Sequence, residues 1–478
     1  MRLPWQKWSV TSASCLVLLC RRVFRQKMRL GYNILFVIFF WLSAPYYFWK
    51  MWRRARALGV DWRAGFGERF GRYTPEFKAT MAARPVIWLH AVSVGETGVC
   101  LQLISQLESR LPGWQFAVST TTSTGMAELQ KRLPAHIARF YYPANLAGIV
   151  RRAMETIKPR ALILMESELW PNLLWEAQDR GIPVFLVNAR VSDRSLHGYR
   201  RFGFLFRPIF TQFRGVGCQA PGEAERLALL GFPAGAIRVT GNLKFDGAKP
   251  DPRAGPDVPG MLRQIGVNEN ARLLVAGSTH DGEEAVLVGM LPRLRERFPD
   301  LFLVLVPRHF ERTKEVCQML DSHGVKFIRR TDITAETHLV AGAVQCLLVN
   351  STGELKFFYE QATLVFVGKS LTARGGQSPI ESAALGKAMV FGPNMQNFRS
   401  AAQAFVAAQG AIQVETAVEL EEKFAELLAD DALRARLGEQ ALKVYQSNLG
   451  ATGRTVEMIL ETGRDVFGSG SRSFKSIV

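Results

Sequence analysis

Acidic and basic side chains follow apolar, strand-like runs at several places in the first half of the chain. Glu96 lies in LHAVSVGETG (89–98) at the start of a helical pattern, and Glu166 directly continues the apolar run ALILM (161–165). Lys244 lies in GNLKFD (241–246), which reads as the end of another strand. Such a carboxylate can remove a proton from an acceptor hydroxyl, and such a lysine can stabilise a phosphate or carboxylate. Each also has an ordinary explanation, because carboxylates in a first helical turn complement the helix dipole and lysines at strand ends are often simply solvated.

The second half repeats this arrangement with groups suited to binding an anion or a nucleotide. Arg308 follows LVLVP (303–307), and its planar guanidinium suits a phosphate or carboxylate. Thr352, Gly353 and Glu354 open a predicted helix whose backbone N–H groups can hold a phosphate. Glu381 lies in the first turn of a helix that follows the Gly375-Gly376 loop, where it can accept both hydroxyls of a ribose or act as an ordinary cap.

One further stretch is a weaker candidate for anion binding, and recognisable metal-binding motifs are missing from the sequence. AGSTHDGEE (276–284) is a glycine turn into a helix, and therefore a plausible anion cradle. The sequence has no DxD carboxylate motif and no His/Asp metal cluster that we can defend. We therefore predict metal-independent chemistry without a cofactor, in which basic side chains and helix termini meet the phosphate charge.

The residues named above must be positioned by two parallel sheets. Near-continuous apolar runs alternate with amphipathic helical stretches, a pattern typical of strands that are buried on both faces. The predicted strands cover 86–92, 116–122, 139–143, 161–166, 184–189, 216–220, 237–242, 272–278, 301–307, 326–330, 346–350, 363–368 and 388–393. Ligands in such sheets bind beyond the carboxyl ends of the strands, so we expect the candidate groups to face a cleft between two domains.

The predicted fold is α/β, with two Rossmann-like domains. The first covers residues 59–246 and the second 261–440, and the proline-rich segment 247–260 links them. A C-terminal helix is expected over 441–467, and the glycine- and serine-rich residues 468–478 are expected to be disordered.

The N-terminal region has the composition of a membrane anchor. Residues 1–72 carry 14 Lys/Arg against 2 Asp/Glu, and this charge brackets an uncharged apolar stretch at 30–49. That placement favours a membrane surface over a nucleic acid as the partner. We predict an anchor over 28–58 that Pro45 kinks or ends, with residues 1–27 as a possible non-native extension before a start at Met28.

Two further patterns bear on the environment of the protein. Six scattered cysteines without a CxxC pair argue against a zinc site or a disulfide framework, and fit a reduced, cytoplasmic location.

Residues 194–214 interleave five arginines with six aromatic side chains: Tyr199, Phe202, Phe204, Phe206, Phe210 and Phe213. We interpret this stretch as a membrane-facing patch, and the alternative is a core helix with a solvated basic face.

Taken in order, the motifs resemble those of one family, the lipid A 3-deoxy-D-manno-octulosonic acid (Kdo) transferases. The resemblance runs from about Met28 to the C-terminal helices and includes RLGYN (29–33), GERFGRY (67–73), HAVSVGE (90–96), ESELWPN (166–172), NARVSDRS (188–195), GNLKFD (241–246), GSTHDGEE (277–284), VPRH (306–309), TGEL (352–355) and GGQSPIE (375–381). It departs from the family at Gln377 and Ser378, where GGHNP is usual.

The resemblance implies a fold, a reaction and residue roles. The fold is GT-B, with an acceptor-binding N-terminal domain and a C-terminal domain for the donor, CMP-Kdo. The reaction is inverting transfer to the lipid A precursor lipid IVA, at the cytoplasmic face of the inner membrane and without nucleic acid. Glu96 corresponds to the general base, and Glu166 and Lys244 to groups that stabilise the transition state. The residues that correspond to the CMP-Kdo site are Pro307, Arg308, Thr352, Gly353, Glu354, Ser378, Pro379, Ile380 and Glu381.

Two other functions remain open from the residues. One is a GT-B enzyme that uses a UDP-sugar, either a transferase or a 2-epimerase. The other is an inactive membrane scaffold on the same fold, against which the presence of Glu96, Glu166, Lys244 and Arg308 argues.

Overall fold

The computed structural model describes residues 10–57, 63, 65–248 and 255–468. The chain divides into two compact units, which are described separately. Unit 1 comprises Met1–Gly241 and Thr452–Val478, and unit 2 comprises Asn242–Ala451. The predicted tail from residue 469 and most of the predicted linker, residues 249–254, lie outside the described residues.

Unit 1 is built on a parallel sheet of seven strands in the order β3-β2-β1-β4-β5-β6-β7. The strands are β1 (Val86–His90), β2 (Gln115–Thr120), β3 (Ala138–Tyr141), β4 (Pro159–Met165), β5 (Val184–Ala189), β6 (Phe213–Cys218) and β7 (Ile237–Val239). Strands β1 and β4 are direct neighbours, with His90 in register with Leu164, so the residues that follow them emerge side by side at one edge.

The helices of unit 1 include one that is much longer than the rest. They are α1 (Val10–Ala57), α2 (Phe66–Arg69), α3 (Pro75–Ala83), α4 (Val94–Arg110), α5 (Ser123–Arg132), α6 (Ala147–Ile157), α7 (Pro171–Asp179), α8 (Asp193–Arg201), α9 (Gly203–Phe210), α10 (Pro221–Leu230), α20 (Ala451–Thr462) and α21 (Arg464–Phe467). Helix α1 continues through Pro45. Of the two effects expected from this proline, a kink or the end of the helix, the second is therefore excluded.

The last helices return to unit 1 after the whole of unit 2. Arg110 on α4 pairs with Glu457 on α20, at 2.7 Å, and Arg454 donates to the Thr240 carbonyl at 2.9 Å. Gly215 on β6 lets α20 approach closely, because a Cβ there would lie 2.7 Å from Oγ1 of Thr462. Helix α20 is therefore part of the packing of unit 1.

Unit 2 repeats the architecture with a second parallel seven-stranded sheet, in the order β10-β11-β9-β8-β12-β13-β14. Its strands are β8 (Leu273–Thr279), β9 (Phe302–Pro307), β10 (Phe327–Arg329), β11 (Cys346–Leu348), β12 (Leu364–Val367), β13 (Met389–Phe391) and β14 (Ile412–Gln413). Consecutive residues such as Leu274 and Val275 belong to two different core clusters, so both faces of this sheet are covered.

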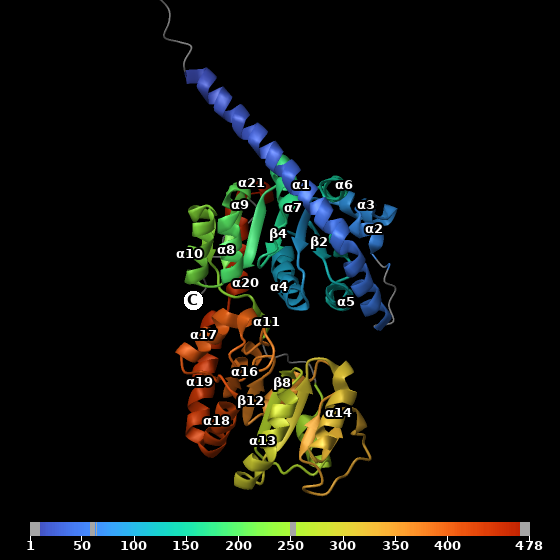
Figure 1. The fold of residues 1–478 in the computed structure, drawn as a ribbon, viewed down its shortest axis with the longest axis vertical. Helices are drawn as coiled ribbons and strands as arrows, with labels where there is room; N and C mark the ends of the chain where they lie inside the picture. Colours follow the sequence, from blue (N-terminus) through green and yellow to red (C-terminus); the bar gives the residue numbers. More distant parts are fainter. Residues whose placement is uncertain (1–9, 58–62, 64, 249–254, 469–478) are drawn as a thin grey trace, which may run out of the picture. The chain divides into compact units, whose positions relative to one another are not determined.

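Helices cover the second sheet as well (Figure 1). They are α11 (Lys244–Gly247), α12 (Val258–Gln264), α13 (Glu283–Arg297), α14 (Thr313–Ser322), α15 (Leu355–Gln361), α16 (Ile380–Ala384), α17 (Arg399–Ala407), α18 (Ala417–Ala429) and α19 (Asp431–Asn448). Two parallel Rossmann-like sheets confirm the predicted α/β fold of the GT-B kind.

The predicted strands all correspond to strands of the structure, with two local differences. The two-residue strand β14 was missed, because Ile412 and Gln413 are too short a run to be recognised. Lys244 does not end a strand: β7 stops at Val239, and Lys244 is the first residue of α11. Gly241, with a φ of 92°, turns the chain between them, and the Asn242 side chain accepts the Lys244 N–H.

The six aromatic side chains of the stretch over 194–214 are divided between the core and the surface, and its five arginines are all exposed. Phe210 and Phe213 are buried, and Phe206 packs between Tyr199 and Phe210 with ring centroids 4.8 and 5.9 Å apart. Only Phe202 and Phe204, at the junction of α8 and α9, are largely exposed among the six aromatic residues. The prediction of a continuous membrane-facing patch was therefore wrong for Phe210 and Phe213, which are buried.

Candidate active site

Glu96 is fixed at the carboxyl edge of the first sheet by the start of α4. Ser93 is the N-cap residue and accepts the Glu96 N–H, while its hydroxyl donates to the Glu96 carboxylate at 2.8 Å. The Val92 N–H donates to the other carboxylate oxygen at 2.9 Å. This is a capping box, so the ordinary structural role of Glu96 is present. It also holds the carboxylate of this residue, which is 8% exposed as a whole, in one orientation beyond strand β1.

Glu166 comes directly after β4 and is held by a cation that the sequence analysis did not single out. Arg190, which follows β5, donates from Nε to Glu166 at 2.7 Å. Glu166 is buried and has a φ of 52°, in the left-handed region that non-glycine residues rarely adopt. Such backbone strain is typical of functional positions. The clue to Arg190 in the sequence was its own place after a strand, in NARVSDRS.

Glu168 makes this edge a group of three carboxyl side chains. Burial, together with the negative charges of Glu96 and Glu166, raises the pKa of Glu168 to about 7, against the opposing effect of a hydrogen bond from Trp170. That bond runs from the indole Nε1 to the carboxylate at 3.0 Å. A carboxyl group with a pKa near neutrality can both accept and release a proton.

Three rings pack in tilted pairs beside the carboxylates. The His90 and Tyr142 ring centroids are 4.1 Å apart, and those of Tyr142 and Trp170 are 5.6 Å apart. His90 is fully buried, its Nδ1 lies 2.9 Å from the Ser119 hydroxyl, and burial lowers its pKa to about 3. The imidazole is therefore neutral at physiological pH and serves as part of a rigid wall.

In unit 2, Arg308 at the end of a strand and Glu381 at the start of a helix act on one another. Arg308 follows β9 and is exposed, with its N–H bonded to the Thr279 carbonyl at 3.0 Å. Glu381 lies in the first turn of α16, as predicted. Burial raises the pKa of Glu381, and the positive charges of Arg308 and Lys356 oppose that rise. The structure thus groups two of the predicted donor-site residues and adds Lys356.

The predicted anion cradle at GSTHDGEE is filled by a side chain of the protein itself. Glu283, the first residue of α13, is fully buried. Its carboxylate accepts four backbone N–H groups at 2.7–2.9 Å, from His280, Lys369, Ser370 and Leu371. Of these four amides only that of His280 belongs to the predicted cradle, and it is not available to a phosphate. Glu283 instead ties the loop after β8 to the loop after β12.

The remaining predicted donor residues occupy loops at the same edge of the sheet. Pro307 is the last residue of β9, and Thr352 and Gly353 are exposed just before α15. The Glu354 carboxylate accepts from Arg330 at 3.0 Å and from Ser351 at 2.7 Å, so its side chain is already engaged.

The glycine loop before α16 is held open by specific contacts. Gly375 has a φ of 121° and donates to the Gln396 side chain, and Gly376 has a φ of 71° and donates to the Lys369 carbonyl. The Ser378 hydroxyl accepts the Ile380 N–H, and Pro379 is the N-cap residue of α16. Lys244 lies apart on α11, with its ammonium over the Phe398 ring at 5.2 Å.

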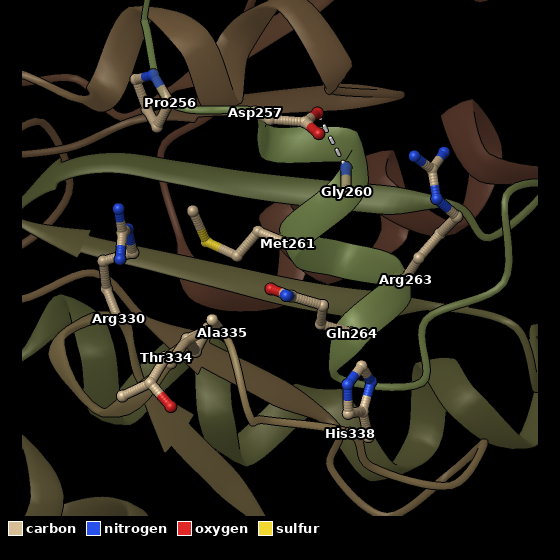
Figure 2. A pocket seen from close by; sticks show the side chains of 11 residues that line it. Pro256, Asp257, Gly260, Met261, Arg263, Gln264, Arg330, Thr334, Ala335 and His338 are labelled. Atoms are coloured by element: carbon tan, nitrogen blue, oxygen red, sulfur yellow. Dashed lines mark hydrogen bonds between the residues drawn. The ribbon is translucent and has the colours of Figure 1, made fainter.

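A separate cavity of about 650 Å³ lies beside α12 and contains none of the predicted site residues (Figure 2). Arg263, Gln264, Arg330 and His338 are among its lining residues. Arg330 connects it to the site, because the same guanidinium holds Glu354.

The comparisons decide the family. Residues 64–247 match the family model described as 3-deoxy-D-manno-octulosonic-acid transferase (kdotransferase). The 3-deoxy-D-manno-octulosonic acid transferase of Bordetella pertussis is 33% identical over 87% of this chain and 96% of its own length. The chain belongs to the 3-deoxy-D-manno-octulosonic acid transferase family. It is therefore a glycosyltransferase, as the motifs implied.

Two other proteins are also similar to this member of the Kdo transferase family. The Haemophilus influenzae transferase of the same name is 31% identical over 83% of this chain and 91% of its own. A solved glycosyltransferase structure from Rickettsia africae has a TM-score of 0.56 at 12% identity, and covers 81% of this chain and 99% of its own. The latter likeness concerns the fold alone.

Proposed function

We propose that this protein transfers Kdo from CMP-Kdo to the lipid A precursor lipid IVA in lipopolysaccharide synthesis. The observation that carries the proposal is the relationship to a transferase of that name over 96% of the relative's length. Two sets of groups support it: carboxylates at the sheet edge of unit 1, and the Arg308 and Glu381 pair at the sheet edge of unit 2.

In the proposed reaction a hydroxyl of the acceptor sugar attacks the anomeric carbon of Kdo. An oxygen–carbon bond forms there while the bond to the phosphate oxygen of CMP breaks, and CMP leaves with the electron pair. Glu96 takes the proton of the hydroxyl as general base. One displacement of this kind inverts the anomeric configuration. Glu166, oriented by Arg190, and Lys244 stabilise the charges of the transition state.

The donor is proposed to lie across the loops of unit 2. Arg308 and backbone N–H groups of Thr352 and Gly353 meet the phosphate of CMP, and Glu381 accepts the ribose hydroxyls. Pro307, Ser378, Pro379 and Ile380 shape the surface around the nucleotide. Because the Glu354 carboxylate is held by Arg330, Glu354 contributes by fixing its loop rather than by touching CMP. No metal ion or cofactor is needed in this scheme.

The test of the base is Glu96→Gln in an assay of Kdo incorporation into lipid IVA. A capping box accepts glutamine as well as glutamate, so this change removes the base with little effect on the helix start. Loss of a general base typically lowers the rate by about 10²–10⁴-fold. Glu108→Gln, on the same helix and paired only at the surface with His136, is the matched control and should retain full activity. Full activity of Glu96→Gln would remove Glu96 from the mechanism.

Nucleotide choice separates the proposal from a UDP-sugar enzyme on the same fold. Calorimetry should detect CMP binding that Arg308→Ala weakens, and little binding of UDP. Preference for UDP would favour the alternative, and absence of binding to both nucleotides would favour an inactive scaffold. The proposed location is the cytoplasmic face of the inner membrane, with α1 as the anchor.

A further inference from the structure

Helix α1 carries the membrane-seeking segment of the protein. Its portion Gln26–Arg53 is long and apolar enough to cross a bilayer by length and composition. Composition alone does not say whether the helix crosses the membrane or lies along it. The contacts between α1 and the rest of unit 1 bear directly on that question.

One face of α1 is docked on unit 1 by polar contacts at its beginning. Arg29 forms a salt bridge with Asp179 on α7 at 2.6 Å. The Tyr32 hydroxyl accepts from Asn145 at 3.0 Å, and the Asn33 side chain accepts from Asn172 at 2.8 Å. Residues 29, 32 and 33 are spaced to lie on one helical face. Polar partners of this kind fix a definite arrangement, because breaking them leaves partly buried groups unpaired.

The same face remains covered further along the helix. Ala44 is buried at 6% exposure, and Phe48 stacks near Phe66 on α2 with centroids 5.6 Å apart. Residues 29 and 48 are separated by about 28 Å along a helix that rises about 1.5 Å per residue. This is close to the roughly 30 Å thickness of the hydrocarbon core of a bilayer.

A crossing orientation conflicts with these contacts. If the docked stretch from residue 29 to residue 48 spanned the hydrocarbon, the side of unit 1 that carries α7 and α2 would have to enter it too. Helix α7 carries Glu176, Asp179 and Arg180, and α2 carries Glu68 and Arg69. Each charge placed near the bilayer centre costs about 2.5–3.5 kcal/mol or more. The docked face therefore stays on the protein side, and the opposite face is the one that meets lipid.

The outward face is apolar in its first part and carries rings and cations typical of a membrane interface in its last part. Leu35, Trp41 and Leu42 are exposed at 69%, 68% and 78%. Beyond them, Lys50, Arg53 and Arg56 lie over the rings of Tyr46, Trp49 and Trp52 at 5.0–5.7 Å. A spanning helix places such rings and cations at a narrow belt, whereas here they extend over ten residues, or about 15 Å. This spread matches a helix that lies in the boundary between headgroups and acyl chains.

We propose that α1 is an in-plane membrane element that rests on the surface of an anionic phospholipid bilayer and does not cross it. The docked face holds unit 1 against the membrane, and the outward face enters the acyl region to a shallow, nearly uniform depth. Basic side chains at 50, 53 and 56 bind anionic headgroups. The proposal concerns membrane topology and does not depend on the reaction that unit 1 and unit 2 perform.

The test is the depth of single probes on the outward face of the full-length protein. Cys15, Cys20 and Cys317 are replaced by serine, and single cysteines at Leu30, Ile38 or Trp49 carry an environment-sensitive fluorophore. The protein is bound to vesicles of phosphatidylethanolamine and phosphatidylglycerol that contain nitroxide lipids labelled at shallow or deep positions. A label at Ser109 on α4 is the aqueous control, and an unchanged far-ultraviolet circular dichroism spectrum checks that each variant folds.

The proposal predicts shallow quenching of similar strength at all three positions and none at Ser109. A spanning helix would instead place Ile38 about 12 Å deeper than Leu30, because eight residues separate them along the helix. That deep maximum at Ile38 would overturn the proposal, and so would absence of quenching at all three positions. Because the readout is independent of Kdo transfer, loss of activity in a variant does not affect it.

Discussion

Removing the Glu283 carboxylate should destabilise unit 2 much more than a single acidic residue normally would. The side chain is fully buried and accepts four backbone N–H groups from two loops. In Glu283→Gln one carboxylate oxygen becomes an amide NH₂, which faces two N–H donors instead of accepting from them. Each buried donor left without an acceptor costs about 1–3 kcal/mol. We therefore expect a loss of about 3 kcal/mol in the free energy of unfolding of unit 2.

The distribution of tryptophan makes this effect measurable. All ten tryptophans precede residue 176, so tryptophan fluorescence reports on unit 1 alone, whereas circular dichroism reports on both units. For an m-value of about 2–3 kcal/mol/M in urea, a loss of about 3 kcal/mol lowers the midpoint by about 1 M. This shift should occur in the circular dichroism transition and not in the fluorescence transition.

A control and a refuting result follow from the same helix. Glu296→Gln, at an exposed position of α13, should change stability by no more than about 0.5 kcal/mol. If Glu283→Gln costs less than about 1 kcal/mol, the four hydrogen bonds do not hold the loops together as described. If the fluorescence transition shifts together with the circular dichroism transition, the effect is not confined to unit 2.

Three further outcomes are expected in unit 1. The pKa of Glu168 is raised from 4.5 to about 7, so the contribution of this group to wild-type stability is greatest below pH 4.5 and is lost as pH rises through 7, by up to about 3 kcal/mol. Glu168→Gln should abolish this fall between pH 5 and pH 8, measured by urea unfolding with tryptophan fluorescence, and an unchanged pH dependence would contradict the assigned burial. Arg190→Ala should cost about 2 kcal/mol in the same assay and reduce Kdo transfer, because it leaves the buried Glu166 without its cation, whereas Arg190→Ala combined with Glu166→Gln should recover part of the stability. Phe202→Ser with Phe204→Ser should weaken vesicle binding without changing the unfolding midpoint, whereas Phe206→Ser alone should lower the free energy of unfolding by about 3 kcal/mol because its ring packs on Phe210.

The strands and the places of Glu96, Glu166, Arg308 and Glu381 could be predicted because they depend on local pattern. A continuous apolar run predicts a buried parallel strand, and the residue after such a strand emerges at the edge where ligands bind. The first turns of α4 and α16 were recognisable for the same reason, since capping residues and glycine turns are short-range signals.

What could not be predicted depends on partners that are distant in sequence. Glu283 looks like an ordinary acidic residue of a first helical turn, and its role comes from the N–H groups of Lys369, Ser370 and Leu371, more than eighty residues later. Arg190 gains its significance from Glu166 on the neighbouring strand. Phe206 and Phe202 have the same type and nearly the same position in the sequence, yet only the packing of Tyr199 and Phe210 decides which of them is covered.

The return of the chain from unit 2 to unit 1 has a consequence for biosynthesis. Unit 2 is one continuous stretch, so all of its strands and helices have been synthesised while α20 is still to be made. The flank of β6 that Thr462 and Met458 later cover is open until then, at a time when neighbouring nascent chains could pair with it. Unit 2 can thus begin to fold before unit 1 is complete. A premature stop near codon 450 would leave unit 2 nearly complete and would remove α20 from unit 1.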